Sequence, residues 1–405
     1  MTLKVPVGLR RTRLMTRHRL AAPVASVTDA AEAMIALHAT DPATVYLSAW
    51  ARTGCAVADV DETLYETRGL VRALGMRRTM FVIPAPFVPV VQAACADDIA
   101  RRLRRQLERD LERLGGIANA GAWLRDVGES VVAALAARGS AAGADLSADE
   151  PRLRTQLVYA ADKSYGGPAN ITSRVLMLLS AEGLIVRGRP RGGWTSGQFK
   201  YHPAHAWLGD VAGPGRGNAE LDPDAARAEL AGAWLRTFGP APVSDLQWWA
   251  GWTRTQTKAA LDALPVTEAD LDGQPGVALA DDADGDSDAG SDGDVSADPA
   301  PVAALLPGLD PTPMGWQDRS WFLGPHAPQL FDRTGNVGPT VWWEGRVIGG
   351  WAQRQSGEIV YRLLEDAGSD ASAAVEAAAA RLMSWLGSLR VTPRFRTPLE
   401  RELSA

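Results

Sequence analysis

Three stretches rich in glycine, proline or charge divide the 405-residue chain, at 113–121, 211–223 and 281–300. Such residues favour turns and flexible connections, and single cores usually stop growing below this length, so several domains are expected. The third stretch holds eight aspartates between 281 and 299, and the formal net charge of −6 therefore hides a slightly basic remainder. The predicted domains are 1–115, 116–217, 218–280 and 301–405, with 281–300 as an acidic disordered insertion.

The second block repeats a pattern that is typical of a winged helix. Ile171, Val175 and Leu178 mark one face of a helix, and a strand follows at 184–186. After a tip rich in arginine and glycine, a return strand is predicted from Trp194 to Tyr201. The cationic residues of this hairpin are candidates for contact with DNA phosphates. They are Arg187, Arg189, Arg191 and Lys200.

Related patterns predict two more modules of this kind. In the third block, helices are expected over 224–239, from Ser244, and from Thr253 to Pro265. In the first block, a helix is expected to stop near His38-Ala39-Thr40 and another to begin at Pro42. A hairpin from 70 to 83 follows, with candidate DNA contacts at Arg72, Arg77 and Arg78.

The predicted fold class is therefore α+β, with three tandem winged-helix (helix-turn-helix) modules and a β-rich C-terminal domain. In that last domain, glycine-rich turns separate β-branched and aromatic residues, and a terminal helix is expected near 371–387.

Two basic segments can be interpreted in more than one way. No acid precedes Asp29, while six basic residues lie among the first twenty, which indicates an arm that contacts phosphates through Arg10, Arg11 and Arg13. A disordered, solvated terminus remains the alternative. The helix expected over 98–115 is interpreted as a packing helix with a solvated charged face, with a nucleic-acid stripe as the alternative.

Several classes of site are not expected. No apolar run is long enough to span a membrane, and the segment after the basic start lacks the apolar core of an export signal. Two cysteines are too few for a disulfide framework or a cysteine zinc site, so a cytoplasmic protein without metal or cofactor is predicted. Nothing resembles a dimer seam, so a monomer is expected.

The chain resembles the winged-helix DNA-binding family that includes the AlkZ-like DNA glycosylases. The resemblance rests on "LHATDPATVYLSAWAR" (37–52), "LVRALGMRRTMFVIP" (70–84), "LLPGLDP" (305–311) and "RTGNVGPTVWWEGRVIGGW" (333–351). It implies double-stranded DNA as the partner and repair as the setting. Active members carry Gln-hydrophobic-Gln or Gln-hydrophobic-Asp where this chain has His38-Ala39-Thr40, and they hydrolyse the N-glycosidic bond of alkylated or crosslinked purines.

His38 and Thr40 are therefore the candidate catalytic residues of a monofunctional DNA glycosylase for bulky N-alkylated purines. A neutral imidazole can accept a hydrogen bond from water or act as a general base, and the Thr40 hydroxyl can orient that water. Asp41 can stabilise positive charge or cap the following helix. A structural histidine, in a non-catalytic regulator or lesion sensor that binds DNA, is the alternative. The arginine-tipped hairpins are expected to converge on one cationic cradle around His38.

Overall fold

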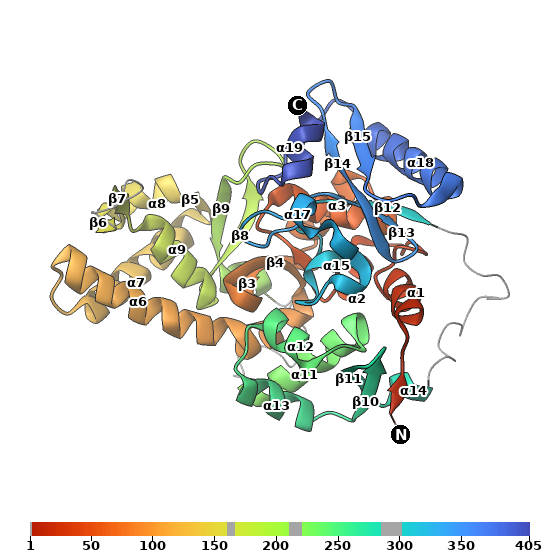
Figure 1. Ribbon diagram of the computed structural model, residues 1–405. Coiled ribbons are helices and arrows are strands. Elements are labelled where there is room, and N and C mark those ends of the chain that lie inside the picture. The colour runs from red at the N-terminus through yellow and green to blue at the C-terminus, as the bar shows by residue number, and fades with distance from the viewer. Residues whose placement is uncertain (1, 160–166, 210–220, 285–301) are drawn as a thin grey trace.

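The computed structural model describes residues 2–159, 167–209, 221–284 and 302–405, and it has a mixed α+β architecture with several small sheets (Figure 1). The α+β class is confirmed, whereas the assignment of three winged-helix modules stays a prediction. Residues 210–220 and 285–301, which hold most of the second and third punctuating stretches, lie outside the described residues.

The N-terminal block centres on a three-stranded antiparallel sheet of order β2-β4-β3. The 70–83 hairpin is confirmed as β3 and β4, which pair from Leu70–Pro84 to Gly75–Thr79. The elements are β1 (Leu3–Lys4), α1 (Val7–Arg17), α2 (Val27–Ala33), β2 (Leu37–His38), α3 (Pro42–Thr53), α4 (Val57–Asp61), β3 (Leu70–Gly75), β4 (Thr79–Pro84) and α5 (Val88–Val91).

The second block has an apolar core of its own, built on the long helix predicted at 98–115. Leu107 and Leu111 of this helix pack with residues of the block's other helices, such as Leu124 and Leu179. The elements are α6 (Asp97–Gly115), α7 (Ala120–Arg138), β5 (Ala141–Ala142), α8 (Gly143–Asp149), β6 (Gln156–Tyr159), β7 (Gly167–Asn170), α9 (Thr172–Ala181), β8 (Ile185–Pro190), β9 (Phe199–Pro203) and α10 (Ala204–Leu208).

The third block has the predicted order of three helices, and a hairpin follows them. The strand β1 from the N-terminus adds to this hairpin in parallel. The C-terminal part is a four-stranded antiparallel sheet of order β12-β13-β14-β15, followed by the predicted terminal helix. The main elements are α11 (Pro223–Phe238), α12 (Val243–Ala250), α13 (Arg254–Asp262), β10 (Val266–Leu271), β11 (Gln274–Leu279), β12 (Ala303–Leu306), β13 (Thr340–Trp343), β14 (Arg346–Gln353), β15 (Ile359–Leu363), α18 (Gly368–Leu386) and α19 (Pro398–Ser404).

One apolar core contains residues of all four blocks, although the second block contributes only a few, such as Val186 and Trp194. Buried residues as distant in sequence as Tyr46, Trp234 and Trp342 belong to the same cluster. In Figure 1 the red N-terminal block accordingly lies between the green third block and the blue C-terminal sheet. The glycine-rich and charged stretches thus divide the sequence without dividing this core.

Two local predictions in the N-terminal block need correction. The basic N-terminus is folded rather than an extended arm, because Leu14 and Met15 of α1 are buried in the shared core. The first predicted helix ends at Ala33, since Ile35 adopts a positive φ of 66° and the chain then pairs with β4. The motif His38-Ala39-Thr40 therefore begins on a short strand.

The second hairpin also differs from its prediction. Its strands are 185–190 and 199–203, so Arg187 and Arg189 lie on a strand and the tip is formed by residues 191–198. The tip is not free, because Trp194 is buried against the rings of Tyr46 and Trp385, at centroid distances of 4.9 and 6.0 Å. These contacts hold the hairpin against the first block and helix α18.

A fully buried ion pair connects α3 to the segment after β12. The guanidinium of Arg52 donates to both carboxylate oxygens of Asp310, at 2.9 and 2.8 Å, and neither side chain is exposed to solvent. Ser48 and the backbone N–H of Thr312 also donate to Asp310. Although burial alone raises the pKa of Asp310, the charge and hydrogen bonds of Arg52 hold it below its ordinary value.

We expect Asp310→Asn to destabilise the protein by roughly 3–5 kcal/mol, because the Arg52 charge would stay buried without its counter-ion. The measurement is the free energy of unfolding in denaturant. Glu402→Gln is the matched control, since Glu402 pairs with Arg362 on the surface, where both side chains are about half exposed. That change should cost less than about 1 kcal/mol. Equal losses in the two variants would contradict the importance of the buried pair.

Candidate nucleic-acid interface and catalytic segment

Strand β2 holds the first candidate catalytic residue. His38 pairs with Phe81 across the sheet, and their rings meet edge to face at a centroid distance of 5.4 Å. The backbone N–H of Thr40 donates to Nδ1 of His38 at 3.5 Å, which is a long hydrogen bond. No described residue forms a hydrogen bond with Nε2 of this ring.

The imidazole of His38 is neutral at physiological pH. Its side chain is only 6% exposed, and burial, followed by the nearby charge of Arg77, lowers its pKa to about 3. The long contact from the Thr40 N–H to Nδ1 favours the tautomer that carries the proton on Nε2. With this tautomer the ring offers a hydrogen-bond donor at Nε2, while the role of His38 as a general base stays a prediction.

The other polar member of the motif is more accessible. Thr40 is partly exposed, and its hydroxyl has no hydrogen-bond partner among the described residues. Its carbonyl accepts from Nη1 of Arg394 at 3.3 Å. A free hydroxyl beside a donor at His38 can orient a water molecule.

Asp41 caps helix α3, as one of the two sequence interpretations proposed. One carboxylate oxygen accepts from the backbone N–H of Ala43 at 3.1 Å, and the other accepts from the backbone N–H of Arg394 at 2.8 Å. Burial raises the pKa of Asp41, and these two hydrogen bonds oppose the shift. Since both oxygens are engaged, this carboxylate has a structural role.

Contacts with the C-terminal part fix the start of α3. The hydroxyl of Thr44 donates to the carbonyl of Gly308 at 2.7 Å, and Ser48 donates to Asp310 at 2.7 Å. Two of the stretches that carry the family resemblance, 37–52 and 305–311, thus lie against each other. This packing, rather than β2 alone, holds the orientation of the candidate catalytic segment, residues 38–40.

The predicted DNA contacts of the N-terminus lie against the C-terminal block. Arg10 is 7% exposed and stacks on Trp321, with 4.1 Å between its guanidinium carbon and the ring centroid. Arg11 donates to the carbonyl of Trp321 at 3.0 Å, and Arg13 is partly buried. The buried Arg10 has no free surface for a phosphate.

The cations of the hairpins have different surroundings. Arg72 is 2% exposed and lies over Phe199, whose ring also meets Arg187. Arg189 pairs with Asp61 at 2.6 Å and with Glu66 at 2.9 Å, and Arg191 pairs with Asp145 at 2.7 Å. Lys200 is partly exposed. Of this set, the two arginines bound to carboxylates are already neutralised.

Arg77 and Arg78, in the β3–β4 turn, differ from the other predicted contacts. Both line a pocket of about 530 Å³, together with arginines of α6. The guanidinium of Arg77 lies 3.8 Å from the ring centroid of Trp248, and Arg319 lies 5.1 Å from the same centroid. The predicted contacts do not include Arg319, and the sequence analysis gives a nucleic-acid stripe on α6 only as the alternative, although the excess of arginine in "RRLRR" (101–105) is a usable signal.

The described residues form neither a metal centre nor a membrane-spanning helix. They contain no group of three His, Cys, Asp or Glu side chains that could hold a metal ion. None of the described helices is long and apolar enough to cross a membrane. Burial raises the pKa of Cys95 to about 12, so this thiol is unreactive.

Comparison with known proteins identifies the family. The DNA glycosylase AlkZ-like family matches residues 31–385, which is most of the chain. The chain belongs to the AlkZ-like DNA glycosylase family. Its fold is shared with the DNA glycosylase AlkZ of Streptomyces sahachiroi, at 18% sequence identity and a TM-score of 0.70, over 97% of this chain and 100% of that chain. No curated protein sequence matches the chain. Family membership makes this a DNA-repair glycosylase-like protein.

The neutral state of His38 in this family member predicts a pH dependence of stability. The unfolded chain binds a proton at His38 below about pH 6.5, whereas the folded chain does so only near pH 3. The free energy of unfolding should therefore fall as the pH drops from 6.5 toward 3, by roughly 1 kcal/mol per pH unit from this residue.

Denaturant unfolding at pH 7.0, 6.0 and 5.0 measures this effect. In His38→Asn, the free energy of unfolding should decrease less steeply as the pH falls, by roughly 1 kcal/mol per pH unit less than in the wild type. The reason is that the variant lacks the imidazole, which in this pH range binds a proton only in the unfolded chain. An unchanged slope in His38→Asn would mean that the imidazole is protonated equally in both states.

Proposed function

We propose that this monomeric cytoplasmic protein binds duplex DNA and hydrolyses the N-glycosidic bond of bulky N-alkylated or crosslinked purines. The observation that carries the proposal is the arrangement of residues 38–40. The His38 Nε2–H and the Thr40 hydroxyl have no partner among the described residues, and contacts from the C-terminal part hold their segment rigidly. The fold of a protein named as a DNA glycosylase supports it.

Hydrolysis of this N-glycosidic bond needs little catalytic assistance from the protein. A purine alkylated at nitrogen is cationic and a good leaving group, so the protein need only position water near C1′ and stabilise the oxocarbenium character. In our proposal Thr40 accepts a hydrogen bond from this water, and His38 donates through Nε2 to the water or the lesion. Neither residue has to become charged during the reaction.

In the proposed site, DNA phosphates balance the positive charge of nearby arginines. Arg77 acts on His38 as a positive charge, and a cation alone would oppose the developing oxocarbenium ion. A bound phosphodiester offsets that charge. We therefore propose that the winged-helix modules contact the DNA backbone through Arg77, Arg78, Arg187 and Lys200. We also keep Arg11 and Arg13 of the N-terminus as backbone contacts. The buried Arg10 and Arg72 are excluded. Arg189 and Arg191 contribute only by exchanging their carboxylate partners for phosphates.

A second function is favoured by one observation. Burial lowers the pKa of His38 to about 3, so its imidazole is a weak base for removing a proton from water. A DNA-binding lesion sensor or regulator without hydrolytic activity is compatible with this arrangement. The two functions differ in whether an abasic site is formed.

The test uses the full chain and duplexes that contain 7-methylguanine or a nitrogen-mustard crosslink, followed by alkali to cleave abasic sites. We expect strand breaks, with Thr40→Val and His38→Ala lowering the single-turnover rate about 100-fold. Binding to undamaged duplex should be unchanged in both variants. Arg381→Gln, an exposed change on α18, is the surface control.

Each other outcome has a definite meaning. Tight binding without strand breaks would replace the glycosylase by the lesion sensor. Strand breaks at the wild-type rate in both variants would remove His38 and Thr40 from the reaction. Failure of the wild-type chain to bind any duplex would overturn both functions.

A further inference from the structure

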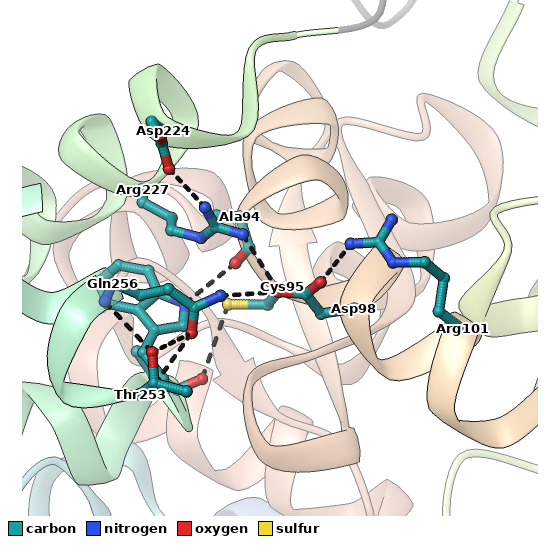
Figure 2. A network of polar contacts seen from close by, with 10 residues as sticks. Ala94, Cys95, Asp98, Arg101, Asp224, Arg227, Thr253 and Gln256 are labelled. Atoms are coloured by element: carbon teal, nitrogen blue, oxygen red, sulfur yellow. Dashed lines mark hydrogen bonds and ion pairs between the residues drawn. The ribbon is translucent and has the colours of Figure 1, made fainter. Parts of the chain in front are cut away.

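We propose that the pocket between the β3–β4 turn, the start of α6 and the α12–α13 turn binds phosphate groups of the DNA backbone. We call it the arginine pocket. The inference rests on the proposed binding of duplex DNA and adds contacts on α6, namely Arg102 and Arg105, which the sequence analysis assigned to a solvated packing helix. Figure 2 shows the polar network at its edge.

Five guanidinium groups and a single carboxylate line the arginine pocket. Arg77 and Arg78 come from the β3–β4 turn, and the other three come from α6. Ala94, Cys95 and Trp252 contribute surfaces without charge, and the volume is about 530 Å³. A cavity of that size accepts more than one phosphate group, and its charge excludes cationic or apolar ligands.

The carboxylate of Asp98 is already saturated by neighbours. It accepts from Arg101, from Nη2 of Arg227 at 3.1 Å and from the side-chain amide of Gln256 at 3.0 Å (Figure 2). Although burial alone raises the pKa of Asp98, these hydrogen bonds and charges hold it below the ordinary value. The charge of Asp98 is thus balanced by its own partners at the contact of α6 with α11 and α13, and it does not neutralise the other arginines of the pocket.

The remaining four arginines of the pocket have no carboxylate partner among the described residues. They are Arg77, Arg78, Arg102 and Arg105. Arg78, Arg102 and Arg105 are exposed, so a ligand can reach them. Arg77 instead lies against Trp248 beside a further cation, Arg319. Like charges gathered in this way are favourable only when an anion joins them.

A polyanion fits this surface better than a small anion. Arg102 and Arg105 follow each other by about one turn on α6, so two of the pocket's positive charges lie in a row along this helix. The α12–α13 turn, which forms the opposite wall, belongs to the helical part of the third block. A DNA strand carries a phosphate every few ångströms and can engage both walls at once.

The test is fluorescence anisotropy of an undamaged duplex of about 20 base pairs, titrated with the full chain at several salt concentrations. Arg102→Gln with Arg105→Gln should weaken binding at least about tenfold and lower the slope of log K against log salt by about 2. Arg102→Lys with Arg105→Lys should restore most of the affinity, because the charge is retained. Thermal unfolding verifies that each variant is folded.

The matched control removes two exposed arginines that do not line the pocket, Arg125 on α7 and Arg381 on α18. Arg125→Gln with Arg381→Gln should leave the salt slope within about 0.5 of the wild type. If both glutamine double variants behave alike, the arginine pocket is not a phosphate site, while the proposed function stands.

Two further outcomes separate the inference from the proposed function. Wild-type binding that depends on Arg102 and Arg105, without excision of any alkylated base, supports the pocket and removes only the catalytic part of the proposed function. Duplex binding that is unchanged in Arg102→Gln with Arg105→Gln, while that variant loses the binding of inorganic phosphate that the wild type shows, would make the pocket a small-anion site and overturn the inference, and the proposed function would stand.

Discussion

The buried ion pair between Arg52 and Asp310 is the constraint on which the rest of the structure depends. A carboxylate and a guanidinium without solvent are stable only while both stay together, so α3 cannot separate from the C-terminal part without exposing two costly charges. Because Asp41 caps the start of α3 and directly follows residues 38–40, the same pair fixes where those residues lie. The position of the candidate catalytic segment therefore depends on long-range packing rather than on its own sequence.

That packing also decides the chemistry that the segment can offer. Burial of His38 beside Phe81 keeps its imidazole neutral, and the Thr40 N–H favours the proton on Nε2. The segment then offers one hydrogen-bond donor, the Nε2–H of His38, and one hydroxyl, that of Thr40, near the positive charge of Arg77. Such a site can orient and polarise, and the cationic leaving group of an alkylated purine needs no stronger acid or base.

The sequence predicted the elements whose signals are local. The helix at 98–115 and the 70–83 hairpin follow from apolar periodicity and turn residues, and both are present. It could not predict what depends on partners far along the chain. The basic N-terminus was interpreted as an arm because its charges are evident, whereas the cavity that receives Leu14 and Met15 is made by distant residues. For the same reason, side-chain burial at His38 and Arg72 had no local signal.

The anchored tip of the second hairpin has a mechanical consequence. Because Trp194 packs against the rings of Tyr46 and Trp385, the tip of the hairpin cannot move to enclose a ligand. Any adjustment needed for a fit must then come from the double helix, which would bend, twist or open to meet a preformed surface. Since the energy of such distortion varies with base sequence and is lower where stacking is already weakened, rigidity in the protein becomes a means of discriminating among DNA sites.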